Sequence, residues 1–294
     1  MRAADAAGLS FVLVSFALNS VVTRLLVAGG LLDPGLATAV RFVAGAAALA
    51  LLALALGRAS DARPRRRSAL PAVALGAYAL LISYGYAHVG AAAGTLVFYA
   101  CVLATMTLGG ALVHRLAPPG RALAGGLLGL AGVGVLALGR VEGTTPLGVL
   151  LLAGTGVAWG IYSLQGRGHA DAFAFSAGNF ALLALALLPF AAWRVADGAP
   201  WTGAGLALAA GMGAITTALA YVAWYRLQPR LAPAQAAAYQ MAIPVLTAGM
   251  AVLALDEPFT PRLVGAATLV LAGMALASWP RRARATAGAA ATEA

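Results

Sequence analysis

Aromatic and amide side chains inside long apolar segments are the residues of this chain best suited to bind a small molecule. The sequence AYQMAIPVLTAGM places Tyr239, Gln240 and Pro244 within an apolar stretch long enough to cross a bilayer as a helix. Polar groups are costly in hydrocarbon, so such side chains usually face the interior of a helix bundle. Proline also frees the carbonyl four residues earlier, here that of Gln240, from its helical hydrogen bond. We therefore expect this stretch to face a cavity or a gate.

Comparable side chains lie deep in four other apolar segments. A cavity lined by tyrosine and tryptophan, with a few amide groups, suits a flat amphipathic solute. The alternative is that these rings only pack the bundle. We predict a substrate site formed by Asn19, Tyr78, Ile82, Tyr99, Trp159, Tyr239 and Gln240.

The titratable residues favour neither catalysis nor metal binding. All nine acids and all three histidines fall in predicted loops, tails or segment ends, where anchoring is their expected role. Cys101 is the only cysteine, which excludes an internal disulfide and a cysteine-based zinc site. An intramembrane enzyme would need a nucleophile with a base, or metal ligands, at membrane depth. We therefore expect no enzyme activity, no metal, no cofactor and no proton transfer through a buried acid.

The composition indicates an integral membrane protein. Of 294 residues, 62% are hydrophobic and only 10% charged, with a mean hydropathy of +0.89, whereas soluble domains are about one quarter charged. The net charge of +10 comes with 19 arginines and no lysine, mostly in short runs between apolar segments. This pattern fits the excess of basic residues in cytoplasmic loops and predicts no nucleic-acid partner.

Ten apolar segments are long enough to span a bilayer, and the first reads as a span, not as a signal peptide. Their approximate limits are 8–29, 35–57, 69–88, 92–114, 121–139, 147–165, 173–194, 204–228, 233–255 and 262–279. With ten spans, 14 arginines fall on the side of the termini and 3 on the other, which predicts cytoplasmic termini. Arg24 and Arg41 lie at the outer ends of the first two spans, where we expect both to reach toward the interface. The alternative for Arg41 is a role in an outer gate or in holding a substrate carboxylate.

The two halves of the chain resemble each other. LAGVGVLAL, from Leu130, aligns with LAGMALA, from Leu271, at an offset of 141 residues that pairs Gly132 with Gly273. At an offset of 138, Arg41 aligns with Asn179. Because five is odd, a second set of five helices enters the membrane from the opposite face, as in many secondary transporters. We therefore predict an all-α integral membrane protein of ten transmembrane helices in two inverted five-helix repeats, residues 1–143 and 144–280, followed by a basic cytoplasmic tail, 281–294.

Several of these residues also resemble a known family. The Arg41-Phe42 pair, Pro244 and the stretch LDEPFTPRLVGAATLVLAGMALA, which contains Glu257, Gly265 and Gly273, resemble the drug/metabolite transporter superfamily in its ten-helix, EamA-type branch. The first half departs from the pattern, with Leu116 and Val102 at the positions corresponding to Glu257 and Pro244.

The resemblance implies a carrier in the bacterial inner membrane, and the aromatic spans are most similar to exporters of aromatic amino acids. The expected partners are a small-molecule substrate, an aromatic or other amino acid, and the lipid bilayer, with the protein acting as a monomer. The alternatives are an efflux carrier for lipophilic or cationic drugs, and a passive channel or scramblase.

Overall fold

A computed structural model of the chain describes residues 3–58, 61, 69–114, 120–138, 144–166, 169, 171–231, 239–240 and 242–278. These residues are helical apart from short connections, and their only β-type pairing is an isolated bridge between Leu32 and Trp201. The predicted all-α class is confirmed. The arginine-rich loop at 62–68 and the tail from 281 lie outside the described residues.

Nine of the described helices are long and apolar enough to cross a membrane, and a tenth, α11, is shorter. The helices of the first half are α1 (Ala3–Ala28), α2 (Pro34–Ala55), α3 (Ala69–His88), α4 (Ala91–His114) and α5 (Gly120–Leu138). Those of the second half are α6 (Pro146–Gly166), α7 (Ala172–Ala196), α8 (Gly203–Gly211), η3 (Met212–Leu219), α9 (Ala220–Leu227), η4 (Gln228–Arg230), α11 (Ala242–Leu255) and α12 (Pro261–Ser278). Among them α8, η3, α9 and η4 form one continuous span, Gly203–Arg230.

The helix bounds follow the predicted spans closely, with two differences. The first helix begins five residues earlier than predicted, at Ala3. The ninth span, predicted from residue 233, is described as α11 only from Ala242, with Tyr239 and Gln240 helical before it. Residues 232–238 and Met241 lie outside the described part.

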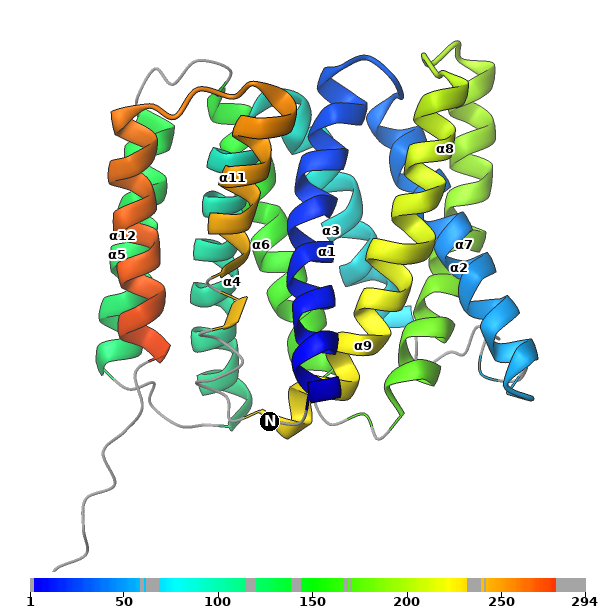
Figure 1. The fold of residues 1–294 in the computed structure, drawn as a ribbon, viewed down its shortest axis with the longest axis horizontal. Coiled ribbons are helices and arrows are strands. Elements are labelled where there is room, and N and C mark those ends of the chain that lie inside the picture. The colour runs from blue at the N-terminus through cyan, green and yellow to red at the C-terminus, as the bar shows by residue number, and fades with distance from the viewer. Residues whose placement is uncertain are drawn as a thin grey trace, which may run out of the picture.

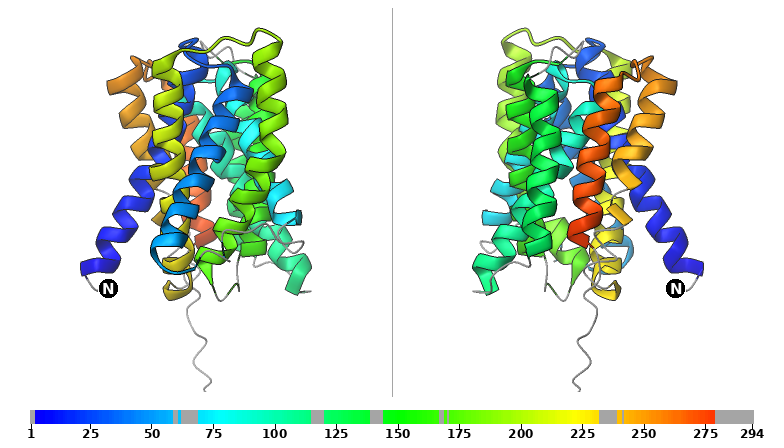
Figure 2. Two further views of the ribbon diagram at one scale, coloured as in Figure 1. Left: turned by 90° about the vertical axis from the view of Figure 1, so that its right-hand side faces the viewer. Right: turned by 90° about the vertical axis from the view of Figure 1, so that its left-hand side faces the viewer.

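The helices form one bundle whose ends define two faces. Figure 1 shows α5 and α12 side by side at one edge and α2, α7 and α8 at the other, with α1, α3, α4, α6 and α11 between them. The start of α1 and the end of α12 lie at the same end of the bundle in every view (Figures 1 and 2). The number of passes is therefore even.

The contacts between α5 and α12 follow the internal repeat. A Cβ atom on Gly125 would lie 2.4 Å from the Gly273 carbonyl oxygen, and one on Gly132 would lie 2.9 Å from that of Ala266. In the alignment of the two halves at an offset of 141 residues, Gly125 corresponds to Ala266 and Gly132 corresponds to Gly273. The contact between Gly125 and Gly273 is therefore related by the repeat to the contact between Ala266 and Gly132. Such reciprocity is expected of a two-fold axis between the helices. It supports the inverted repeat on which the predicted fold rests.

The antiparallel helices α2 and α7 are joined in the same reciprocal way at both ends. Asp33 caps α2 by accepting hydrogen bonds from two backbone N–H groups, and it pairs with Arg194 near the end of α7 at 2.7 Å. Asp171 caps α7 in the same manner and pairs with Arg58, just after α2. Both acids combine capping with an ion pair. We call these two pairs the α2–α7 latches.

Candidate functional site

Six aromatic rings meet in the interior of the bundle. They belong to α1, α3, α4, α6 and α9, and we call them the aromatic cage: Phe16, Tyr78, Phe98, Tyr99, Trp159 and Tyr221. Each of these side chains is at least 93% buried. Both halves of the chain contribute rings, so the cage lies between the repeats.

Trp159 is the centre of the cage. Its ring centroid lies 5.0 Å from those of Tyr78 and Tyr221 and 6.0 Å from that of Phe16, the last at an interplanar angle of 86°. Tilted and edge-to-face arrangements of this kind are the favoured ones for aromatic pairs. The geometry therefore places ring edges and faces where a further flat ring could pack.

The cage encloses a cavity of only about 10 Å³. This is about the space that one water molecule needs. An amino acid does not fit between the rings as they stand. Binding a substrate there requires the surrounding helices to separate.

Five of the seven predicted site residues line this cavity: Asn19, Tyr78, Ile82, Tyr99 and Trp159. Tyr239 and Gln240 are not among its lining residues. Both are half-buried, and Tyr239 packs against the main hydrophobic core.

Sequence reasoning missed Phe16, Phe98 and Tyr221 as lining residues, along with Ser20. Tyr221 carried the same signal as the predicted rings, an aromatic residue deep within a span. Phe98 adjoins Tyr99, and Phe16 lies one helical turn before Asn19. The two phenylalanines were missed because an apolar ring in an apolar segment is not distinguished from an ordinary packing residue.

The amide of Asn19 is engaged in holding the π-helical turn η3. Its Nδ2 donates to the Thr216 carbonyl at 2.9 Å, and its Oδ1 accepts from the hydroxyls of Thr216 at 2.6 Å and Thr217 at 3.3 Å. A π-helical turn breaks the regular hydrogen-bond pattern and often occurs at functional sites. Asn19 thus positions η3, which leads directly into α9 and Tyr221.

Arg41 does not reach the interface, contrary to expectation. Its side chain is 1% exposed, and its Nη2 donates to the Tyr78 hydroxyl at 3.3 Å. Its guanidinium lies 5.0 Å from the Phe42 ring centroid and 5.5 Å from that of Tyr78. This part of α2 is covered by η3, which packs so closely on the Arg41 backbone that a Cβ atom on Gly213 would clash with the Arg41 carbonyl oxygen. The interior therefore contains a charge next to the cage.

Arg24, four residues before the end of α1, has protein partners at this end of the bundle. It lies 3.5 Å from Glu257 and donates to the Tyr86 carbonyl at 2.7 Å. Glu257 in turn accepts hydrogen bonds from the N–H groups of Ala91 and Ala92 at the start of α4. Its carboxylate is thus placed at the positive end of the helix dipole. These contacts join α1, α4 and the loop before α12, beside a pocket of about 440 Å³.

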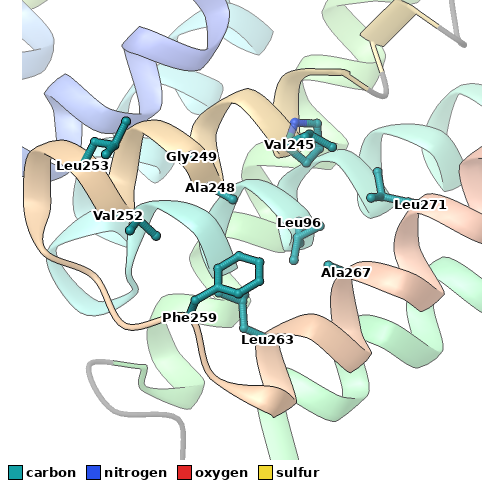
Figure 3. A pocket seen from close by; sticks show the side chains of 11 residues that line it. Leu96, Val245, Ala248, Gly249, Val252, Leu253, Phe259, Leu263, Ala267 and Leu271 are labelled. Carbon is teal, nitrogen blue, oxygen red and sulfur yellow. The ribbon is translucent and has the colours of Figure 1, made fainter.

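A larger apolar groove of about 580 Å³ lies between α4, α11 and α12. Figure 3 shows Val252, Phe259, Leu263 and Leu96 around it. Pro244, the third residue of α11, lines this groove and is not among the residues that line the aromatic cage. In the first half, α4 packs along α5, whereas the described residues of α11 make little contact with α12.

Within the described part of the chain, no three histidine, cysteine, aspartate or glutamate side chains are grouped as a metal site. The buried cage contains aromatic, amide and hydroxyl groups, with the guanidinium of Arg41 beside it. These groups can bind a solute by ring packing and hydrogen bonding.

A membrane-embedded bundle of two inverted five-helix repeats, with a closed cage between them, defines a multi-pass protein of the transporter class. Residues 146–279 match the model of the EamA-like transporter family. A protein of Pseudomonas aeruginosa, described as "Uncharacterized protein PA1977", is 40% identical over 278 residues, or 93% of this chain and 94% of that protein. The chain belongs to the EamA-like transporter family.

A solved structure supports the fold assignment independently. A chain described as "Crystal structure of protein" superposes with a TM-score of 0.66 at 24% sequence identity. The match covers 94% of this chain and 98% of that chain. The likeness extends over both halves of the bundle and concerns the fold alone.

Proposed function

We propose that the protein is a secondary transporter that exports amino acids, aromatic ones in particular, and related metabolites by alternating access. The observation that carries the proposal is the aromatic cage, built from both repeats and closed to about 10 Å³. Aromatic pairs contribute ~0.5–1.5 kcal/mol each beyond the area that they bury. A flat ring inserted among six others gains several such contacts, which a small aliphatic solute lacks.

The structure bears differently on the two alternatives. A cage of tyrosine and tryptophan also attracts cations, but the buried guanidinium of Arg41 beside Tyr78 repels them. The repulsion by Arg41 disfavours efflux of cationic drugs.

The second alternative is a passive channel. The small volume of the cavity favours a carrier over an open channel.

The proposal also includes the membrane, the oligomeric state, the topology and the driving force of the carrier. We assign it to the bacterial inner membrane as a monomer with cytoplasmic termini, with repeats at 1–143 and 144–280. No acid lies among the residues that line the cage. Transport is therefore expected to follow the gradient of the substrate itself, by facilitated diffusion or exchange.

Counterflow in liposomes tests the proposal. Vesicles containing purified protein and loaded with unlabelled phenylalanine should accumulate external labelled phenylalanine transiently, with saturation. Alanine loading should give much less. An imposed pH gradient alone should drive no uptake.

Variants connect this activity to the cage. Tyr99→Leu should weaken phenylalanine counterflow, whereas Trp193→Leu, at a 56% exposed position outside the cage, should not. Non-saturable flux in wild-type vesicles would indicate a pore and contradict the proposal.

A further inference from the structure

Arg41 is a buried cation with no counter-ion among the described residues. Its side chain is 1% exposed, and its Nε and Nη1 groups have no hydrogen-bond partner in that part of the chain. The ion pairs found in the described part of the chain involve other arginines, at the ends of helices. An unpaired charge in a low-dielectric interior is unfavourable by several kcal/mol. The arrangement therefore favours the arrival of an anionic group.

The depth of Arg41 in the bundle matches that of the cage. It is seven residues into α2, roughly 10 Å along the helix from Pro34. Tyr99 is eight residues into α4, and both helices begin at the same end of the bundle. The guanidinium is thus near the level of the cage and away from the membrane surface.

Two phenols connect Arg41 to the cavity. Tyr78 accepts a hydrogen bond from Arg41, which leaves the phenolic proton of Tyr78 available to another acceptor. The Tyr221 hydroxyl lies close to the guanidinium without reaching hydrogen-bond geometry, and it has no other partner among the described residues. Both tyrosines line the cavity. Unused donors from three helical spans, α2, α3 and α9, therefore converge at one wall of the cage.

We propose that Arg41, together with the hydroxyls of Tyr78 and Tyr221, binds the carboxylate of the substrate while the rings of the cage bind its apolar part. This assignment rests on the proposed function and narrows its substrate class to compounds that combine a carboxylate with a flat apolar group. An arginine can present two N–H groups to one carboxylate, and such charge-assisted hydrogen bonds are the strong ones. Arg41 makes no contact with the present small cavity, so its N–H groups become reachable when the cage opens around the substrate.

The position related to Arg41 in the second repeat is not equivalent. It is Asn179, which is fully buried and donates to the Tyr162 hydroxyl at 3.5 Å, while its Oδ1 has no partner among the described residues. An amide oxygen is a neutral acceptor, so it offers nothing to an anion. The two-fold axis therefore relates a cationic side to a neutral side, and a carboxylate is expected to bind in one orientation.

Three matched probes test the carboxylate on the wild-type protein. Phenylalanine, 3-phenylpropionate and 2-phenylethylamine share a ring, and only the first two carry a carboxylate. Binding to purified protein in lipid nanodiscs, measured by displacement of labelled phenylalanine, should show displacement by phenylpropionate and none by phenylethylamine at equal concentration. Equal displacement by the amine would overturn the assignment. Phenylalanine counterflow that persists in that case would leave the proposed function standing.

Substitutions then assign the effect to Arg41. Arg41→Gln should weaken phenylpropionate binding about ten-fold or more, and Arg41→Lys by less, because loss of a charged hydrogen bond has this magnitude. Arg194→Gln removes the same charge at an α2–α7 latch and should leave the affinity unchanged. Unaltered affinity in Arg41→Gln contradicts the proposal.

Three further outcomes are also decisive. If Arg41→Gln does not fold, the affinity of Arg41→Lys for phenylpropionate and the three probes on the wild-type protein still test the carboxylate assignment. A second outcome is that chloride raises the thermal unfolding temperature of the wild type while phenylpropionate does not. That result would indicate an inorganic anion beside Arg41 and would also contradict the carboxylate assignment. Absence of both phenylalanine counterflow and binding of any of the three probes would overturn the proposed function along with it.

Discussion

At the scale of single residues, Trp159 both packs in the core of the bundle and lines the proposed site. Its ring lies within 6.0 Å, centroid to centroid, of Phe16, Tyr78, Tyr162 and Tyr221. The side chain is 3% exposed, and the adjoining cavity has room for about one water. The same ring is therefore part of the core in this structure, and under the proposed function it becomes a binding surface when the cage opens.

Replacing Trp159 by alanine should both destabilise the protein and create a ligand-sized void. Truncation of a buried aromatic residue costs ~3–5 kcal/mol when the surroundings do not collapse. We expect a lower thermal unfolding temperature in detergent, partly restored by indole, which fills the void. Trp193→Ala, at a position 56% exposed, should change the unfolding temperature little and show no response to indole. A small decrease in Trp159→Ala without indole rescue would contradict this picture.

At the scale of helices, close packing of α5 on α12 depends on glycine at particular positions. A Cβ atom on Gly273 would lie 2.4 Å from the carbonyl oxygen of Gly125 and 2.8 Å from the backbone nitrogen of Gly129. Backbone atoms cannot move aside as a flexible side chain can. Small residues allow this approach, as in other membrane helix pairs.

Two glycines of α12 therefore respond differently to the same substitution. Gly273→Ala should separate α12 from α5 and destabilise the protein by about 1–3 kcal/mol, the usual cost of overpacking. Gly265→Ala meets no atom within 4 Å and should be neutral or slightly stabilising, because alanine favours helix. Thermal unfolding of both purified variants measures the difference. Equal stability of the two variants would refute the close contact.

The α2–α7 latches should make stability depend on pH in the acid range. Burial raises the pKa of Asp33, but hydrogen bonds from Arg194 and from the N–H groups of Leu36 and Gly35 outweigh it and leave the pKa below its ordinary value of 3.8. A carboxyl whose pKa is lowered by folding stabilises the protein above its unfolded pKa, and this contribution disappears as the pH falls through the lower folded value. We expect Asp33→Asn to unfold at a lower temperature than wild type at pH 6 and the difference to shrink below about pH 4.

The exposed acid Asp197 provides the control for this pH dependence. It pairs with the same Arg194, but its side chain is 55% exposed, and surface pairs contribute little. Asp197→Asn should therefore follow the wild-type unfolding curve across the same pH range. A constant offset between Asp33→Asn and wild type from pH 6 to pH 3 would contradict the assigned linkage.

Hydropathy was enough to predict most of the helices, since a long apolar run has few alternatives to a helix in a bilayer. It could not predict which way individual side chains point. Arg41 stands near a predicted span end, yet its side chain is buried in the bundle, where η3, some 170 residues away in the sequence, packs on its backbone. The phenylalanines of the cage carry no sequence signal that separates them from ordinary packing residues. The π-helical turn likewise depends on bonds from Asn19 on another helix.

At the scale of the whole molecule, the two repeats have the same helices but different packing. In the first repeat α4 lies along α5, whereas in the second α11 stands away from α12 and leaves the apolar groove of about 580 Å³. The groove is thus a difference between the two repeats that the internal sequence symmetry alone does not predict.

The orientation of the molecule is tested by its arginines. With 14 arginines on the side of the termini against 3 on the other, reporter fusions at Thr286 and in the EGTTP loop, residues 142–146, should report opposite sides, the first cytoplasmic. Moving arginines from the loop at 63–67 to the EGTTP loop should lower the fraction of correctly oriented protein. Reports from the same side in the unmodified protein would contradict an even number of passes with cytoplasmic termini.

The reciprocal contacts between α5 and α12 carry an evolutionary consequence. Because Gly125 meets Gly273 as Gly132 meets Ala266, each helix presents nearly the same surface to the other. An interface of this kind is self-complementary, as in a symmetric homodimer. A half-length ancestor inserted in both orientations could thus have paired with a copy of itself before gene duplication joined the two. After fusion, each copy was free to diverge, so that position 41 carries an arginine and the related position 179 an asparagine.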